Sequence, residues 1–205
     1  MTLLALPAHR TVTDTTLLDL ALDIFADVGF EGASVRELCR RLNVSHNLVH
    51  ERFGSKDQLW QAAVAHGFQE LAVTLASAAA QAPPDPLDRL RAVLIRYVEA
   101  IAARPALIRI INHEATHPGP RLDHLYRVYL RPAHNVSDAA LRLLEEEGRA
   151  HRIPAATLHF LVGHGAGGLA SLPDLAGRFS PTDPDPLTQA RDAVDLILRG
   201  ILIQP

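Results

Sequence analysis

The stretch NHEATHPG, residues 112–119, contains the pattern His-Glu-x-x-His, in which His113 and His117 flank Glu114. Zinc peptidases use this spacing because two imidazoles one helical turn apart can bind a metal, while the glutamate between them can act as a base. Here Pro118 follows His117 directly, and a residue before proline is pushed out of helical geometry. The second histidine is therefore expected where a helix ends, which argues against a peptidase site.

Two other interpretations of these histidines stay open. His113 and His117 could form a regulatory metal site with a third group such as His124. Alternatively, His113 and Glu114 lie at a helix end, beside a ligand pocket or facing solvent. An all-helical metal-dependent enzyme or a metal sensor is thus the alternative function. Our leading expectation is a protein that is not an enzyme and has no catalytic residues, bound metal or cofactor.

A second short pattern, Gly-His-Gly-Ala-Gly-Gly at 163–168, fits the G-x-G-x-x-G of dinucleotide-binding loops. Such a loop needs a strand before it, a helix after it and a parallel sheet around it. The chain shows no alternation of strands and helices that could supply this context. Gly163, Gly167 and Gly168 are instead expected inside a helix, where they would allow close approach of another helix.

The composition indicates a packed protein without a membrane span. Of 205 residues, 48% are hydrophobic and 21% are charged, which is typical of a globular chain. No stretch approaches the roughly 18 uncharged apolar residues that cross a bilayer. The first ten residues do not fit a signal peptide, and Cys39, the single cysteine, excludes an internal disulfide. We therefore expect a cytoplasmic protein with Cys39 buried in its core.

Helical periodicity dominates the chain and predicts an all-α fold. The proline-rich stretch at 82–86 is the best candidate boundary between two domains, at 11–71 and 83–205. In the second domain we expect helices beginning at Pro86 and Pro105, the latter ending near Ile111. Longer helices are expected at about 121–147, with a kink at Pro132, and at about 154–171 and 186–203. The segment 171–186 is predicted to be a loop.

The first domain contains the signals of a helix-turn-helix. Thr13 and Asp14 can cap a first helix that Gly29 closes. Three shorter signals then follow in order: a capping box at Ser34 and Glu37, a turn residue that tolerates left-handed geometry at Asn43, and a cap at Ser45. The helix after Ser45 would enter a major groove of DNA, and a further helix should follow a second capping box at Ser55 and Gln58.

This motif assigns candidate roles in DNA binding. His46, Asn47, Leu48 and His50 would face base edges, with Asn47 suited to adenine and Leu48 to a thymine methyl. Arg36 could reach the groove or a phosphate. Ser34, Ser45, Arg52 and Lys56 are of the right type for phosphates. The chain has a formal net charge of −3. Between residues 34 and 56, however, five basic residues (Arg36, Arg40, Arg41, Arg52, Lys56) oppose two acidic ones (Glu37, Glu51).

The segment LALDIFADVGFEGASVRELCRRLNVSHNLVHERFGSKDQL resembles the DNA-binding domain of the TetR family of transcriptional regulators, over about residues 11–71. The resemblance is carried by the following marks: Phe25, Gly29, Phe30, the Ser34 region, Val44-Ser45, Phe53 and Ser55-Lys56-Asp57-x-Leu59. It implies a helical ligand-binding and dimerisation domain after the helix-turn-helix, and a homodimeric repressor that a small-molecule effector releases from double-stranded operator DNA. The sequence departs from the family pattern at Asn43, Asn47, His50 and Arg52, so the operator sequence cannot be taken from a relative.

The expected effector site and dimer contact lie in the second domain. Apolar cavities with a few polar groups are typical ligand sites. We expect one lined by Phe68, Tyr97, His113, Tyr126 and Tyr129. The homodimer is expected to form through the last two long helices, at about 154–171 and 186–203. There, Leu187, Ala190, Val194, Ile197, Leu198 and Ile201 make an apolar stripe, and the three glycines would let the preceding helix approach a partner.

Overall fold

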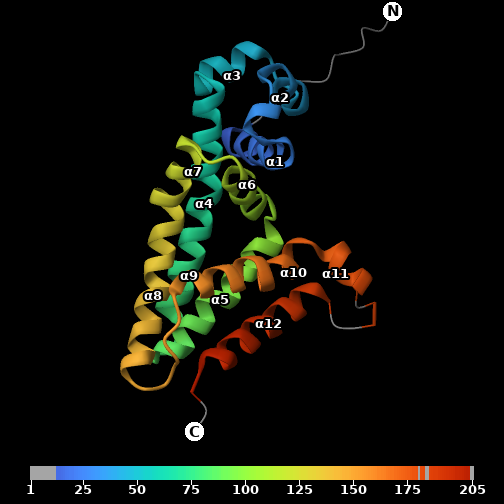
Figure 1. Ribbon diagram of the computed structural model, residues 1–205. Coiled ribbons are helices and arrows are strands. Elements are labelled where there is room, and N and C mark those ends of the chain that lie inside the picture. Colours follow the sequence, from blue (N-terminus) through green and yellow to red (C-terminus); the bar gives the residue numbers. More distant parts are fainter. Residues whose placement is uncertain (1–12, 180, 183–184, 204–205) are drawn as a thin grey trace, which may run out of the picture. The chain divides into compact units, whose positions relative to one another are not determined.

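The computed structural model describes residues 13–179, 181–182 and 185–203, and the regular elements of these residues are helices, as predicted (Figure 1). The chain divides into two compact units, residues 1–66 and 67–205. Helix α4 (Lys56–Gln81) contributes to both units. The domain limits expected from the sequence stay a prediction. The N-terminal segment that does not fit a signal peptide lies outside the described residues.

The first unit contains α1 (Asp14–Gly32), α2 (Val35–Leu42), α3 (His46–Phe53) and the start of α4. Thr13, Ser34 and Ser45 each cap a helix by accepting a hydrogen bond from a backbone N–H three residues on. These caps begin the helices where the sequence predicts. The reciprocal half of the capping box at Ser34 is absent, because the carboxylate of Glu37 is bound to arginines of its own helix.

A break at Gly29 shapes the end of α1. Its backbone φ of 71° interrupts the helix, and glycine adopts this value without the steric cost that a side chain brings. One further turn follows to Gly32, so the predicted end at Gly29 is a break within a slightly longer element. Phe25 and Leu22 from α1, Leu38 from α2 and Trp60 from α4 are almost fully buried. Cys39 is also buried, as expected.

The second unit contains the rest of α4 and the helices that follow it. They are α5 (Pro86–Ala103), α6 (Ala106–Thr116), α7 (Pro120–Leu125), η1 (Tyr126–Leu130), α8 (Arg131–Glu146), α9 (Ala155–Phe160), η2 (Leu161–Ala166), α10 (Gly167–Ser171), α11 (Pro173–Phe179) and α12 (Pro186–Ile201). Helix α5 packs against α8, α10 and α12, so it is the central element of this unit (Figure 1). Asp85 and Asp185 cap α5 and α12, each directly before a proline, as the sequence predicts.

Three sequence expectations for this unit need correction. Helix α6 continues beyond Ile111 to Thr116. The kink expected at Pro132 takes the form of a π-helix, η1, immediately before the proline; a π-turn shifts the hydrogen-bond register that proline interrupts. The segment 171–186 is not a continuous loop, because Pro173 begins a short helix, α11, in which proline occupies the tolerated first position.

The apolar stripe of α12 belongs to the core of its own chain. Ala190, Val194, Leu198 and Ile201 are buried in one cluster with residues of α5 and η2. Two of the three glycines also face inward: a Cβ placed on Gly163 or Gly167 would lie within 4 Å of Tyr97. Assigning this stripe and these two glycines to the partner contact is therefore wrong, because the periodicity marks a buried face without showing what buries it.

Within the described ranges, no helix is both long enough and apolar enough to span a membrane.

Candidate functional site

The first turn of α3 presents exposed side chains directly after the tight turn at Asn43. Asn43 has φ 53° and ψ 44°, the left-handed geometry predicted for it, and Ser45 accepts a hydrogen bond from the N–H of Leu48 at 3.1 Å. His46 and Asn47 are exposed, whereas Leu48 is half-buried. Val49 and the half-buried Phe53 occupy the opposite face. The turn and the cap thus leave a small polar face at the N-terminus of α3.

The arginines of α2 differ in whether they already have an ion-pair partner. The guanidinium groups of Arg40 and Arg41 donate to the carboxylate of Glu37 at 2.6–2.8 Å. These hydrogen bonds, first from Arg40 and then from Arg41, lower the pKa of Glu37 to about 2. Arg36 is exposed on the first turn and has no ion pair within the part of the chain that the structure describes. Arg36 is therefore better placed than its neighbours to reach another molecule.

Three of the predicted DNA contacts are bound within the unit. Arg52 forms an ion pair with Asp14 at 2.8 Å. The amine of Lys56 donates to the carbonyl of Phe30 at 2.7 Å and lies 4.1 Å from the centroid of its ring. The Nδ1 of His50 donates to the carbonyl of Gly54 at 2.6 Å. The contacts of Arg52 and Lys56 link α3 and α4 to α1, which composition and spacing do not reveal, whereas that of His50 lies at the end of its own helix.

The geometry around the His-Glu-x-x-His pattern does not match a zinc-peptidase site. Helix α6 ends at Thr116, and His117 is non-helical, as Pro118 predicts. The rings of His113 and His117 stack with centroids 5.2 Å apart. Glu114 is 2% exposed and accepts from Nε of Arg121 at 3.0 and 3.2 Å. Among the residues described, no three or more His, Cys, Asp or Glu side chains are grouped to hold a metal ion.

Glu114 therefore has a structural contact, and we expect Glu114→Gln to destabilise the second unit by about 1–3 kcal/mol. The substitution leaves Arg121 beside a buried neutral amide and removes a charge-assisted hydrogen bond. Urea unfolding followed by circular dichroism measures the change. Glu146→Gln, the same substitution at an exposed position of α8, should leave the midpoint unchanged. Equal midpoints for both variants would show that the ion pair contributes nothing.

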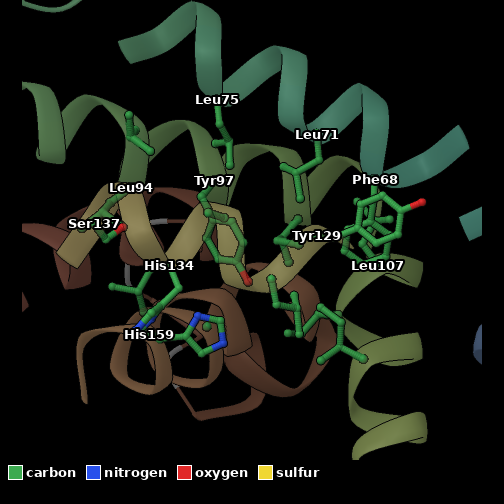
Figure 2. Close-up of a pocket in the computed structure, with 18 of the residues that line it drawn as sticks. Phe68, Leu71, Leu75, Leu94, Tyr97, Leu107, Tyr129, His134, Ser137 and His159 are labelled. Atoms are coloured by element: carbon green, nitrogen blue, oxygen red, sulfur yellow. The ribbon is translucent and has the colours of Figure 1, made fainter. Parts of the chain in front are cut away.

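A cavity of about 110 Å³ lies within the second unit, between α4, α5, α6, α8 and the segment from α9 to η2 (Figure 2). Phe68, Tyr97 and Tyr129 line it, as expected from the sequence. His113 and Tyr126 do not belong to its lining: His113 stacks on His117, and Tyr126 is 50% exposed. The π-turn at η1 rotates Tyr126 and Tyr129 onto different faces, which an α-helical spacing does not predict.

Sequence reasoning missed several polar residues of this cavity. His134, Ser137, His159 and His164 also line it. His134 and Ser137 have the i, i+3 spacing that places two residues on one face of a helix, so a signal for this pair was available. His159 and His164 are five residues apart, and η2 alters the helical register between them. That spacing does not indicate a common face without the structure.

Comparison with known proteins agrees with the resemblance that the sequence of the first unit shows. Residues 17–63 match the family model described as bacterial regulatory proteins, tetR family. An 84-residue segment is 36% identical to an HTH-type transcriptional repressor of Mycobacterium tuberculosis, covering 41% of this chain and 43% of the relative. A segment of 85 residues is 29% identical to the regulator BetI of Burkholderia ambifaria, covering 42% of this chain and 44% of the relative. Residues 17–63 therefore form a DNA-binding domain of the TetR family.

Solved structures extend the likeness in fold to nearly the whole chain. A ketosteroid transcriptional regulator of Mycobacterium tuberculosis superposes with a TM-score of 0.74 at 18% identity, covering 96% of this chain and 98% of that one. The TetR family regulator PfmR of Thermus thermophilus gives a TM-score of 0.63 at 22% identity, covering 95% and 100%. The TetR-type helix-turn-helix is thus followed here by a helical unit of the same fold as in these regulators. The chain matches less than half the length of the curated relatives above in sequence.

Proposed function

We propose that this TetR-family chain is a sequence-specific DNA-binding transcriptional regulator that acts as a homodimeric repressor. The observation that carries the proposal is the exposed polar start of α3, with His46 and Asn47 directly after the turn at Asn43. A short helix presented in this way fits the major groove of DNA. Asn47 can bind the adenine edge with two hydrogen bonds, and Leu48 can contact a thymine methyl.

Contacts to the DNA backbone would fix the position of α3. Arg36 has a free guanidinium for a base or a phosphate, and the first backbone N–H groups of α4 can bind an anion. Ser34 and Ser45 cap helices with their hydroxyl oxygens, but each hydroxyl can still donate to a phosphate. Lys56 and Arg52 would act mainly by holding α4 and α3 to α1, and would reach phosphates only after releasing Phe30 and Asp14.

The dimer is proposed to form through the outer faces of the last long helices. Leu196 on α12 is 69% exposed and Phe160 on α9 is 60% exposed; Leu161, Leu172, Leu175 and Phe179 are exposed apolar residues of the neighbouring segments. Helix α12 packs against η2 and α10, so these elements are adjacent. Exposed large apolar residues that gather on one part of a surface are typical of an interface. A second copy of the chain would cover them by two-fold contacts.

The cavity of the second unit is proposed to bind the effector. A ligand shifts a protein between conformations only if it binds one of them more tightly. The effector should therefore prefer a conformation whose two DNA-binding units have the wrong spacing for the operator. We infer no catalytic activity, since Glu114 is ion-paired with Arg121; turnover of a peptide substrate that Glu114→Gln abolishes would overturn this inference.

Selection of bound sequences from a random pool of double-stranded DNA tests the proposed function. A two-fold dimer should recover a pseudo-palindrome whose half-sites are about one helical turn or slightly more apart. A pool that stays random after repeated selection would remove the proposal, whereas a single half-site without a symmetric mate would remove its dimeric part.

A further inference from the structure

One side of the cavity carries four polar side chains that form no hydrogen bond within the part of the chain that the structure describes. Tyr97 reaches it from α5, His134 and Ser137 from α8, and His159 from α9. We call these four residues the polar side of the cavity. Figure 2 shows the Tyr97 hydroxyl pointing away from α5, toward the side where His134 and His159 lie. The last two rings meet edge-on, with centroids 6.3 Å apart.

The polar atoms of these four half-buried residues keep contact with solvent, since none of them belongs to the described buried atoms that lack a hydrogen-bond partner. Half-buried polar groups that face a mainly apolar cavity are suited to bind the polar atom of a ligand. The neighbouring His164 differs, because its Nε2 is 3.1 Å from the side-chain oxygen of Asn112. The other lining residues are mainly aliphatic, with the stacked rings of Phe68 and Tyr129 among them.

The lining restricts the charge of that molecule. The lining residues include no Asp, Glu, Lys or Arg. An ionised group is costly to bury unless an opposite charge and hydrogen bonds compensate for the lost water. The only lining groups that could become cationic are His134, His159 and His164. Burial, and then the neighbouring imidazoles of His134 and His164, lower the pKa of His159.

The protonation states of the lining residues suit a ligand oxygen that carries no charge. Burial raises the pKa of Tyr97 to about 12, so its hydroxyl keeps its proton and can donate. Burial also raises the pKa of Tyr129, the remaining titratable group of the lining. A neutral imidazole has one donor and one acceptor nitrogen, and a serine hydroxyl can act as either. The polar side therefore offers both donors and acceptors to a hydroxyl or carbonyl group.

Helix geometry keeps space open beside these groups. Both π-helices border the cavity: η1 contributes Tyr129 and Leu130, and η2 contributes Val162, Gly163 and His164. Such π-turns are rare and occur frequently at functional sites. A Cβ placed on Gly163 would lie 3.7 Å from the Tyr97 hydroxyl, an ordinary contact. Glycine here thus leaves free the volume that an atom bound to that hydroxyl would need.

We propose that the cavity binds an uncharged, mainly apolar molecule whose hydroxyl or carbonyl oxygen is held by Tyr97, Ser137, His134 and His159. The proposal rests on the proposed function only in treating the cavity as the effector site. The charge of the ligand follows from the lining alone. A carboxylate with the same carbon skeleton is the competing ligand. Its negative charge would need a protonated histidine as partner, so proton uptake would accompany its binding.

Calorimetry on the full-length protein without DNA tests this proposal. The probes are two matched pairs, 1-octanol with octanoate and 2-naphthol with 2-naphthoate, each titrated at pH 7 in phosphate and in Tris buffer. We expect at least one alcohol to bind, and to bind at least tenfold more tightly than its carboxylate. Its binding enthalpy should be the same in both buffers after dilution correction, because no proton is taken up.

Substitutions in the cavity test which side chains bind the oxygen of the ligand. Tyr97→Phe and Ser137→Ala should each weaken binding of the alcohol by about threefold to tenfold through loss of one hydrogen bond. Tyr126→Phe removes the same hydroxyl outside the lining and should change nothing. Gly163→Ala provides a second approach if Tyr97→Phe unfolds. Its methyl group fits but occupies the space beside the hydroxyl, so it should weaken binding without lowering the midpoint of thermal unfolding.

Three outcomes would overturn the proposal. They are carboxylates that bind as tightly as the alcohols, buffer-dependent enthalpies that report proton uptake with an alcohol, and no binding of either alcohol up to its solubility. The test of the proposed DNA-binding function is independent of the calorimetric test. Alcohol binding that leaves operator affinity unchanged would remove the effector role while the ligand class stands, and failure to bind any operator would not alter the calorimetric result.

Discussion

Leu196→Arg should convert the dimer into a monomer and lower the affinity for operator DNA by about a hundredfold or more. Leu196 is exposed on the face of α12 opposite the buried Val194 and Leu198. A two-fold interface contains the same residue of both chains, so the substitution places two guanidinium groups in an apolar contact. A dimer gains its second half-site as an intramolecular event, which is worth about 10²–10⁴ in affinity and is lost in a monomer.

Light scattering at micromolar concentration and a DNA-binding titration measure the two parts of this prediction. Leu143→Arg is the matched control, because Leu143 is an exposed leucine of α8 outside the proposed interface. The control should remain dimeric and bind DNA normally. A dimeric mass for Leu196→Arg would mean that other surfaces hold the two chains together. A monomer with unchanged operator affinity would show that a single copy is sufficient for recognition.

Asn47→Ala should reduce the affinity for the operator by about 1–3 kcal/mol per half-site and relax the preference at one base position in each half. Its side chain is exposed on the first turn of α3. The alanine variant keeps the helix, because Ser45 provides the cap. Non-specific binding depends on phosphate contacts, so affinity for scrambled DNA should hardly change.

Asn135→Ala, an exposed asparagine on α8, is the control for Asn47→Ala and should bind both DNAs like the wild type. Repeating the selection with Asn47→Ala shows which base position loses its preference. A uniform loss on operator and scrambled DNA would mean that Asn47 contacts the backbone and does not read a base.

Local chemistry explains why the first unit could be predicted in detail. Caps and turns depend on residues three or four apart, so Ser34, Asn43 and Ser45 determine the limits of α2 and α3 without help from the rest of the fold. The same holds for Pro118, which moves His117 out of the helix and argues against the peptidase interpretation of the His-Glu-x-x-His pattern.

Contacts between distant parts of the sequence could not be predicted in this way. Lys56 has the charge of a phosphate ligand, yet its amine is bound to Phe30, 26 residues earlier. The stripe through Val194 was correctly identified as apolar, but spacing cannot distinguish a face buried within the chain from one buried by a partner. His159 and His164 share the cavity only because η2 departs from α-helical register.

A binding titration of the wild-type protein tests most directly whether this chain recognises a specific DNA sequence through α3. The selected operator and a scrambled sequence of the same composition are titrated at two salt concentrations, alongside Asn47→Ala. We expect the wild type to prefer the operator by about 10³-fold or more at physiological salt, and Asn47→Ala to narrow that ratio. Equal affinity of the wild type for both sequences, falling equally with salt, would contradict sequence-specific recognition through α3.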